Sequence, residues 1–337
     1  MESTGIYWMS LFSILTEAGI HVVVANPVHI KQIPKRKTDR KDARWLCTLL
    51  LHGLVRQSFI PCGNQIALRD YCRNRLFYGW QQTKALNRML KILECNNIKL
   101  RSVISSLNTQ TGMAIVRMLA AGITDRTQLA SCAKGSVKAK KEQLILALDG
   151  TLTHHHRIQL AMLLADFDHV QKQLDLLDQA ISSIVSEHYA NVVECLDSIS
   201  GIGIKSAEII ISEAGDDMTR FPSADHFTSW CGIAPGNNES AGKRKNTSVK
   251  KGNAYLRLAI VAAAWGAVHM KDSYWHALYD KLHKRMKAHK AIVAVARRLL
   301  KVVYKTINTM TMYEEKGIAH FLDIQSRNFT YTRLHSR

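Results

Sequence analysis

Apolar residues recur at helical spacing over most of this chain, and a short β-branched run near its start is the exception. Tyr7 to Ala18 has the helical spacing, whereas His21 to Asn26 (HVVVAN) ends at Pro27 and is typical of a buried strand. A helix followed by a strand predicts an α/β sheet. Because a doubly wound domain normally opens on strands, we expect this sheet to lack its first strands; a small sheet that begins here is the alternative.

The middle of the chain predicts long helices. Asn64 to Asn96 has apolar positions three and four residues apart, and basic residues occupy much of its remaining surface. These basic residues are Arg69, Arg73, Arg75, Lys84, Arg88 and Lys91. Such a helix can lie along nucleic acid or present a solvated face. The apolar positions of Leu160 to Val193 suit an antiparallel or coiled-coil helix, which makes an oligomer plausible.

Two segments between these helices also carry predictions. Ala130 to Lys141 is rich in small and basic residues, and we interpret it as an internal boundary. Three consecutive histidines, His154 to His156, point in different directions on a helix. We therefore expect a solvated cluster there rather than a metal site.

A pair of acids stands inside a basic stretch that leads into the predicted helix Trp45 to Leu54. Asp39 and Asp42 are three residues apart, so on a helix they share one face. Two carboxylates on one face, within a positively charged segment, can hold Mg²⁺ beside a phosphate. Taken alone, the pair is explained more simply by a capping acid and a solvated acid, since acids are common in the first turn of a helix.

A glycine-rich turn opens the C-terminal part of the chain. Gly201, Gly203 and Lys205 stand in SGIGIKSA, directly before the apolar helix Glu208 to Ala214. This is the pattern of a helix-hairpin-helix, in which the exposed N–H groups at the start of the second helix can bind a phosphate. A turn between helices that binds nothing is the alternative.

A second glycine-bounded segment, Gly236 to Gly252, carries five cations around Ser240 and Ser248. The cations are Lys243, Arg244, Lys245, Lys250 and Lys251. A serine hydroxyl beside cations can attack phosphorus, because the positive charge lowers the pKa of the hydroxyl and stabilises the pentacoordinate transition state. From local chemistry alone, a loop that contacts phosphates through its backbone is the preferred interpretation.

Charge and composition narrow the class of protein. The 337 residues, of which 47% are hydrophobic and 22% charged, suffice for two or three domains, and the formal net charge of +19 favours a polyanionic partner. No apolar run approaches the ~20 residues of a membrane span, and the start of the chain lacks the pattern of a signal peptide. Seven scattered cysteines without a CxxC pair indicate a reducing compartment. We expect a cytoplasmic, nucleoid-associated bacterial protein.

Seven motifs, in order, resemble one family. They are ESTGIYW, VVVANP, KTDRKDA, GIGIKSAEIIISEAGDDMTRF, WCGIAPGNNESAGK, KKGNAYLR and KAIVAVARRLLKVVYK. Together they resemble the DEDD-type transposases of insertion sequence family 110, over nearly the whole chain. The resemblance implies a RuvC-like domain, a C-terminal serine-bearing domain, and recombination of DNA directed by a structured RNA from the element's own non-coding end.

The resemblance also implies roles for single residues. Glu2 matches the family's second acidic residue, Asp39 and Asp42 match the third and fourth, and Ser240 matches the C-terminal serine. These imply a Mg²⁺ site of Glu2, Asp39 and Asp42, with Ser240 as the nucleophile. Ala241 stands where a second glycine is more typical. The first acidic residue has no counterpart, so we expect a chain truncated at its N-terminus and cleavage by this chain to be in doubt.

These inferences define an α/β plus all-α architecture in four parts. We expect an incomplete RNase-H/RuvC-like domain at 1–61, a helical or coiled-coil connection at 62–190, a serine transposase domain with a helix-hairpin-helix at 191–315, and a tail at 316–337. The partners would be DNA, a guide RNA and further copies of the chain, as a dimer or tetramer. The alternatives are a non-catalytic nucleic-acid-binding remnant and a RuvC-like metal-dependent junction nuclease with Ser240 as a bystander.

Overall fold

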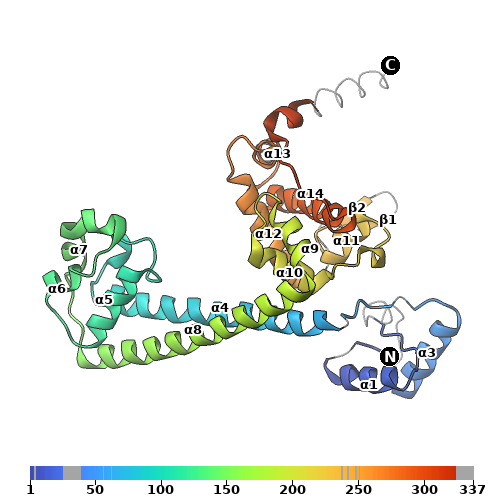
Figure 1. Cartoon of the computed structure of the whole chain (residues 1–337), viewed down its shortest axis with the longest axis horizontal. Helices are drawn as coiled ribbons and strands as arrows, with labels where there is room; N and C mark the ends of the chain where they lie inside the picture. The colour runs from blue at the N-terminus through green and yellow to red at the C-terminus, as the bar shows by residue number, and fades with distance from the viewer. Residues whose placement is uncertain are drawn as a thin grey trace. The chain divides into compact units, whose positions relative to one another are not determined.

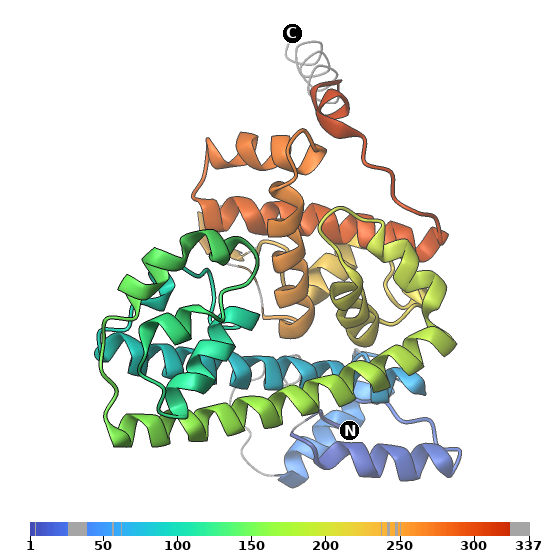
Figure 2. The same ribbon diagram turned by 60° about the vertical axis from the view of Figure 1, so that its left-hand side comes forward.

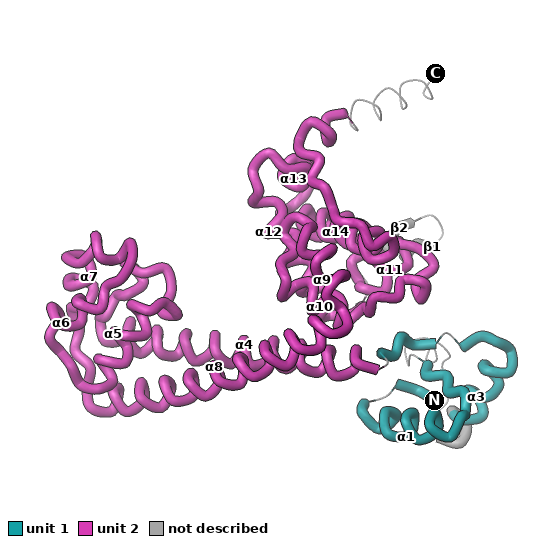
Figure 3. The backbone as a smooth tube through the Cα atoms, in the orientation of Figure 1, with its two compact units in different colours: residues 1–62 teal, residues 63–337 magenta. Residues whose placement is uncertain are grey.

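The structure is a computed structural model that divides into two compact units, residues 1–62 and residues 63–337 (Figure 3). It describes residues 1–3, 5–25, 39–55, 57–61, 63–236, 238–240, 243–246, 249 and 251–323. Most of these residues are helical, which confirms the helical part of the expected architecture. Among the described helices, none has both the length and the hydropathy needed to cross a lipid bilayer.

The first unit contains two helices and a rudimentary β arrangement. Helix α1 (Tyr7–Glu17) lies where the apolar spacing predicts it, and α3 (Asp39–Leu51) starts six residues before the predicted helix and therefore includes both acids. Between them, Ala25 pairs in parallel with Glu2 and antiparallel with Gln57. The Ala25 N–H donates to the Met1 carbonyl at 2.8 Å, and the Ser3 N–H donates to the Ala25 carbonyl at 3.0 Å.

The strand predicted at 21–26 is thus confirmed only in part: the segment is buried and pairs with its neighbours at Ala25, but it does not form a regular strand. Val24 and Ala25 are buried as a strand core requires, and the Ser58 N–H donates to the Val24 carbonyl at 2.7 Å. Each neighbour, however, contributes one paired residue, so the described part of this unit forms isolated bridges rather than strands. Asn26, the last predicted residue, lies outside the described residues.

The second unit is built on an antiparallel pair of long helices, α4 (Asn64–Cys95) and α8 (His154–His188) (Figure 1). Leu68, Met89 and Leu93 of α4 and Leu160 of α8 are fully buried, because the three- and four-residue spacing places them along one face of each helix. Of the antiparallel and coiled-coil arrangements expected for Leu160 to Val193, the structure shows antiparallel packing against α4, in a helix that ends at His188 (Figure 1). His154 and His155 are exposed at the start of α8, as expected of a solvated cluster.

Short helices close one end of this pair around a small core. They are η1 (Leu100–Ser102), α5 (Gln110–Ala120), α6 (Arg126–Ala130), η2 (Gly135–Lys140) and α7 (Lys141–Ala147). Ala130 and Ala133 are buried in the same core as Leu93 and Leu160. The segment from Ala130 to Lys141 is therefore part of a packed end, and its interpretation as an internal boundary is wrong. The small residues of this segment, such as Ala130 and Ala133, let it pack closely in the core and do not mark a linker.

The other end of α8 leads into a C-terminal bundle (Figure 2). Its helices are α9 (Ala190–Asp197), α10 (Ile204–Ala214), η3 (Met218–Arg220), α11 (Ala224–Cys231), α12 (Ala254–Val268), α13 (Tyr274–His283) and α14 (Ala288–Thr309). Ser223, Asn253 and Ser273 cap α11, α12 and α13 by accepting a backbone N–H with their side chains. The strands β1 (Asn238–Ser240) and β2 (Lys243–Asn246) form an antiparallel pair between α11 and α12.

Candidate functional site

The glycine-rich turn joins α9 to α10, and its two glycines have different surroundings. Gly201 has φ +85°, and a Cβ there would lie 2.3 Å from the Ala263 carbonyl oxygen and 2.4 Å from the Ala267 nitrogen. This glycine therefore lets the turn touch the backbone of α12. Gly203 is exposed with φ −96°, and a Cβ there would meet no atom within 4 Å. Of the two, only Gly203 leaves the start of α10 open to a ligand.

Lys205 belongs to an ion-pair chain rather than standing alone at the turn. Its Nζ donates to Asp178 of α8 at 2.9 Å, and Arg75 of α4 donates to the same carboxylate at 3.1 Å. Arg75 also donates to the buried Glu208 at 2.5 Å. Partial burial opposes ionisation of Asp178, but the hydrogen bonds from Lys205 and Arg75 outweigh it and hold the pKa of this carboxyl below its ordinary value.

A buried carboxylate, Glu213, organises the region behind the turn. Its side chain is 1% exposed and accepts two hydrogen bonds from Arg73, at 2.7 and 2.8 Å, and one from Asn253 at 2.7 Å. Arg69 donates to the Glu213 carbonyl at 2.7 Å and lies 3.5 Å from its carboxylate. The prediction that Arg69, Arg73 and Arg75 belong to a basic surface of α4 is therefore wrong. These three arginines form ion pairs with the buried acids Glu213 and Glu208. The sequence signal for this was an acid inside the apolar run EIIISEA.

Ser240 lies at the end of a short hairpin instead of in an open loop. It is the last residue of β1 and pairs with Lys243, the first residue of β2; Glu239 pairs with Arg244. The segment from Gly236 to Gly252 was expected to be a loop, and this expectation is wrong for Asn238–Ser240 and Lys243–Asn246, which form strands. The side chains of Ser240, Lys243, Arg244 and Lys245 lie outside the described residues, as do Ser248 and Lys250, while Lys251 is exposed.

The root of this hairpin is fixed to the bundle. Pro235 and Val249 form an antiparallel bridge, and a Cβ on Gly252 would lie 2.4 Å from the Gly232 nitrogen at the end of α11. Asn253 follows directly, caps α12 through the Leu256 N–H at 3.0 Å, and donates to Glu213. One asparagine therefore connects the buried carboxylate to the hairpin that bears Ser240, a relation that the sequence analysis missed.

The acids of the expected metal site all belong to the first unit. Glu2 is half-buried in the bridge to Ala25, and Asp39 and Asp42 lie in the first turn of α3, with side chains outside the described residues. Their convergence stays a prediction. Among the residues that the structure describes, no group of three His, Cys, Asp or Glu side chains is placed to hold a metal ion.

Two family models match the chain in separate parts. The DEDD-type transposase model of insertion sequence 110 matches residues 1–96, which include all three acids and the whole of α4. The model of the transposase IS116/IS110/IS902 family matches residues 193–280, which include the glycine turn, Glu213 and the Ser240 hairpin. These matches define the class: the chain is similar in both parts to the transposases of insertion sequences. More particularly, it belongs to the IS110 family.

Individual relatives agree with this assignment. The chain is 28% identical over 149 residues to the uncharacterized 43.6 kDa protein of insertion element IS110 from Streptomyces coelicolor, covering 44% of this chain and 36% of the relative. It is 23% identical to the y4qE protein of Sinorhizobium fredii, named as a transposase, over 76% of this chain and 55% of the relative. Another Sinorhizobium fredii protein named as a transposase, y4pF/y4sB, is 24% identical over 63% of this chain and 58% of the relative. The chain thus matches about a third to three fifths of each relative's length.

Proposed function

We propose that this chain recombines DNA by forming a covalent bond between Ser240 and a DNA phosphate. The observation that carries the proposal is the position of Ser240 at the end of a basic hairpin, inside the segment that matches the IS116/IS110/IS902 family. Pairing with Lys243 and the neighbouring Arg244 brings two cationic residues into register with β1. A phosphate at the end of the hairpin would be attracted by them, and positive charge is what a pentacoordinate phosphorus needs.

The proposed step exchanges one phosphate ester for another. The Ser240 oxygen forms a bond to phosphorus, the bond from phosphorus to one deoxyribose oxygen breaks, and the hydroxyl proton leaves the serine while the departing oxygen takes up a proton. Because the phosphoserine keeps the energy of the broken phosphodiester, attack by another DNA hydroxyl can reverse the step and join a new partner. No external energy source is required.

The acids Glu2, Asp39 and Asp42 would hold a divalent cation. A DEDD-type domain suggests such a metal, and carboxylate oxygens are the ligands that Mg²⁺ prefers. We propose Mg²⁺, which when bound supplies positive charge to a phosphate oxygen. The acids and Ser240 belong to different units, so the proposed centre is composite, formed within one chain or between copies in a dimer or tetramer.

Nucleic acid would be held mainly by charge. The net charge of +19 and the exposed Lys251 beside the hairpin support DNA binding, and the start of α10 at the exposed Gly203 would add a contact for a phosphate. We propose that the same positive charge also binds a second polyanion, a structured guide RNA from the element. Gly201 and Lys205 would take part indirectly, the first through packing and the second through its exchangeable pair with Asp178.

The decisive experiment compares two serines of one segment. The purified chain is incubated with Mg²⁺ and DNA that carries the ends of the element, with and without the RNA from its non-coding end, and protein–DNA adducts are separated on denaturing gels. We expect an adduct with the wild-type chain and none with Ser240→Ala, whereas Ser248→Ala, the matched control, should retain it. Both variants should bind RNA normally.

The outcomes separate the rival functions. An adduct that survives Ser240→Ala refutes the serine mechanism. DNA cleavage without any adduct favours the metal-dependent junction nuclease. Tight binding with neither adduct nor cleavage, even with RNA and Mg²⁺, contradicts catalysis by this chain and leaves a nucleic-acid-binding protein.

A further inference from the structure

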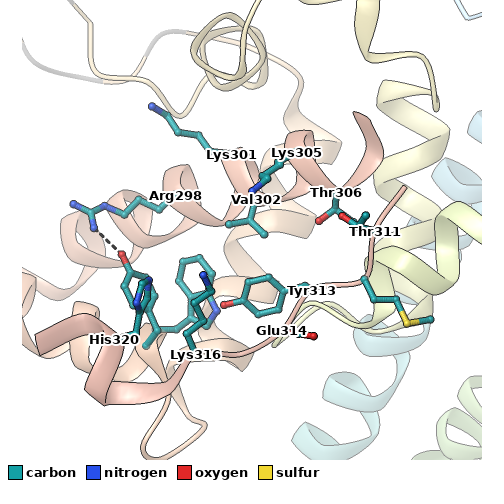
Figure 4. A pocket seen from close by; sticks show the side chains of 13 residues that line it. Arg298, Lys301, Val302, Lys305, Thr306, Thr311, Tyr313, Glu314, Lys316 and His320 are labelled. Carbon is teal, nitrogen blue, oxygen red and sulfur yellow. Dashed lines mark hydrogen bonds between the residues drawn. The ribbon is translucent and has the colours of Figure 1, made fainter. Parts of the chain in front are cut away.

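A pocket of about 520 Å³ lies between α13, α14 and the segment that follows α14, away from the Ser240 hairpin in the chain (Figure 4). Pockets of this size hold small organic molecules. Its walls come from three elements: Tyr274 and Trp275 of α13, residues 298–306 of α14, and the segment from Thr311 to His320. None of these residues has a role in the function proposed above.

One wall of the pocket is aromatic. Trp275 is 1% exposed, and its ring centroid lies 5.2 Å from that of Tyr274 and 6.4 Å from that of Tyr313. Burial raises the pKa of the Tyr313 phenol, with Glu315 adding to the effect, so this group stays protonated and donates to Glu315 at 3.2 Å. Tyr274 and Tyr313 are half-buried and line the pocket, so these two rings, with the buried Trp275 beside them, offer the aromatic surface against which a flat heteroaromatic group can pack.

The rim of the pocket is cationic. Arg298, Lys301 and Lys305 are three and four residues apart on α14 and line the pocket together with Lys316. Lys301 is compensated by Asp225 at 2.7 Å, and Arg298 donates to the Tyr274 hydroxyl at 3.1 Å. Lys305 and Lys316 are exposed and form no ion pair with a described residue. Glu314 is the one acid among the residues that line the pocket, so the four basic side chains leave positive charge that it does not neutralise.

The segment that closes the pocket is held in place by one acid. Glu315 accepts hydrogen bonds from the Tyr274 N–H at 2.9 Å, the Ser200 hydroxyl at 2.9 Å and the Gly317 N–H at 3.2 Å. The Tyr313 N–H donates to the Ser198 hydroxyl at 2.8 Å. Glu315 is thus engaged in fixing the backbone of this wall, and a wall held by its own hydrogen bonds lowers the entropic cost of binding.

We propose that this pocket binds one unpaired nucleotide of a nucleic-acid strand, with the base against the aromatic wall and a phosphate at Lys305 and Lys316. An aromatic surface beside uncompensated cations is the arrangement by which proteins recognise single-stranded nucleic acid. Duplex bases are stacked on one another and cannot enter, so the pocket selects strands with exposed bases. The inference deepens the proposed function, on which it rests for the presence of nucleic acid.

The test uses the full chain and short single strands. RNA and DNA octamers that contain 5-iodouracil are irradiated with the protein, and the cross-linked peptides are identified by mass spectrometry. Affinity is measured with the same octamers and with a blunt duplex. We expect cross-links to Tyr274 or Tyr313 and roughly tenfold weaker binding for the double variant Lys305→Ala/Lys316→Ala. The matched control, Lys284→Ala/Lys287→Ala, removes two exposed lysines from the other ends of α13 and α14 and should change affinity less than about twofold.

Each result has one meaning. Cross-links confined to other parts of the chain, or equal losses for the two double variants, overturn the pocket and leave the proposed function intact. Binding of the duplex as tightly as the single strands, with the same loss in the pocket variant, refutes the selection of an unpaired nucleotide. Absence of binding to every nucleic acid contradicts both proposals. A stronger pocket cross-link with RNA than with DNA, or the reverse, identifies which strand supplies the nucleotide.

Discussion

Arg73 and Glu213 form a two-point hydrogen-bonded ion pair, with Nε and one Nη of the guanidinium donating to separate carboxylate oxygens at 2.7 and 2.8 Å. The pair joins α4 to the last turn of α10, residues that are 140 positions apart in the chain. Because the Glu213 carboxylate is almost fully buried, its negative charge depends on Arg73, Arg69 and the Asn253 amide for compensation.

The first prediction tests this dependence. Glu213→Gln keeps the size of the side chain but leaves the two arginines without their acid, so we expect the free energy of unfolding to fall by about 3 kcal/mol. Urea denaturation followed by circular dichroism measures it. Glu187→Gln, at a side chain that is 70% exposed, is the control and should change stability by less than about 0.5 kcal/mol. Equal effects of the two variants would contradict a structural role for the buried pair.

The second prediction separates the two glycines of the turn. Gly201→Ala places a methyl group 2.3 Å from the Ala263 carbonyl oxygen at φ +85°, so we expect a loss of about 2 kcal/mol or more in stability. Gly203→Ala has free space and ordinary φ, so the fold should tolerate it. If a phosphate approaches the start of α10, Gly203→Ala instead weakens DNA binding, which fluorescence anisotropy detects. A stable Gly201→Ala protein would refute the close packing on α12.

The third prediction concerns the basic residues of α4, which the structure divides into two groups. Lys84, Arg88 and Lys91 are exposed beside Trp80 and form no ion pair with described residues, unlike the three arginines near the start of the helix. Lys84→Ala/Arg88→Ala should leave stability unchanged and reduce the slope of log affinity against log salt by about 1.4 to 1.8, the equivalent of two phosphate contacts. An unchanged slope would exclude this face from nucleic-acid binding.

The fourth prediction concerns thiol reactivity. Burial raises the pKa of Cys72 to about 11 and that of Cys231 to about 12, so both stay protonated near neutral pH, whereas Cys47 and Cys95 are exposed. Iodoacetamide at pH 8 should alkylate Cys47 and Cys95 and spare Cys72 and Cys231 until the protein is unfolded, as peptide mass spectrometry will show.

The same pKa difference makes stability depend on alkaline pH. An unfolded Cys72 loses its proton near its ordinary pKa of 9.0, whereas the folded one keeps it to about pH 11. The unfolded state therefore binds fewer protons in this window, and the free energy of unfolding should fall as pH rises from about 9 to 11. Cys72→Ala, compared with the wild type at each pH, should flatten that part of the curve.

The sequence predicted the elements that depend on local pattern. The apolar spacing of Asn64 to Asn96 fixed a helix that ends at Cys95, one residue early, and the glycine turn was placed correctly between two helices. It could not assign Arg73 to Glu213, since an arginine on a helix surface has the same local pattern whether solvent or a buried acid faces it. The short strands at Ser240 could not be predicted either. A two-stranded pair is stable only when it packs against the rest of the protein, and the local run of cations does not reveal that packing.

The long helices α4 and α8 impose a spacing on whatever the second unit binds. With 32 and 35 residues they are about 48 and 52 Å long at 1.5 Å per residue. At one end Gln65 donates to the backbone of α10, and at the other Leu93 and Leu160 belong to the small core that exposes Lys134, Lys138, Lys140 and Lys141. A duplex that contacted both ends would be contacted at two places about 14 base pairs apart, since each base pair occupies about 3.4 Å along the axis. The helix pair thus holds the bundle and the lysines apart by about the length of α4.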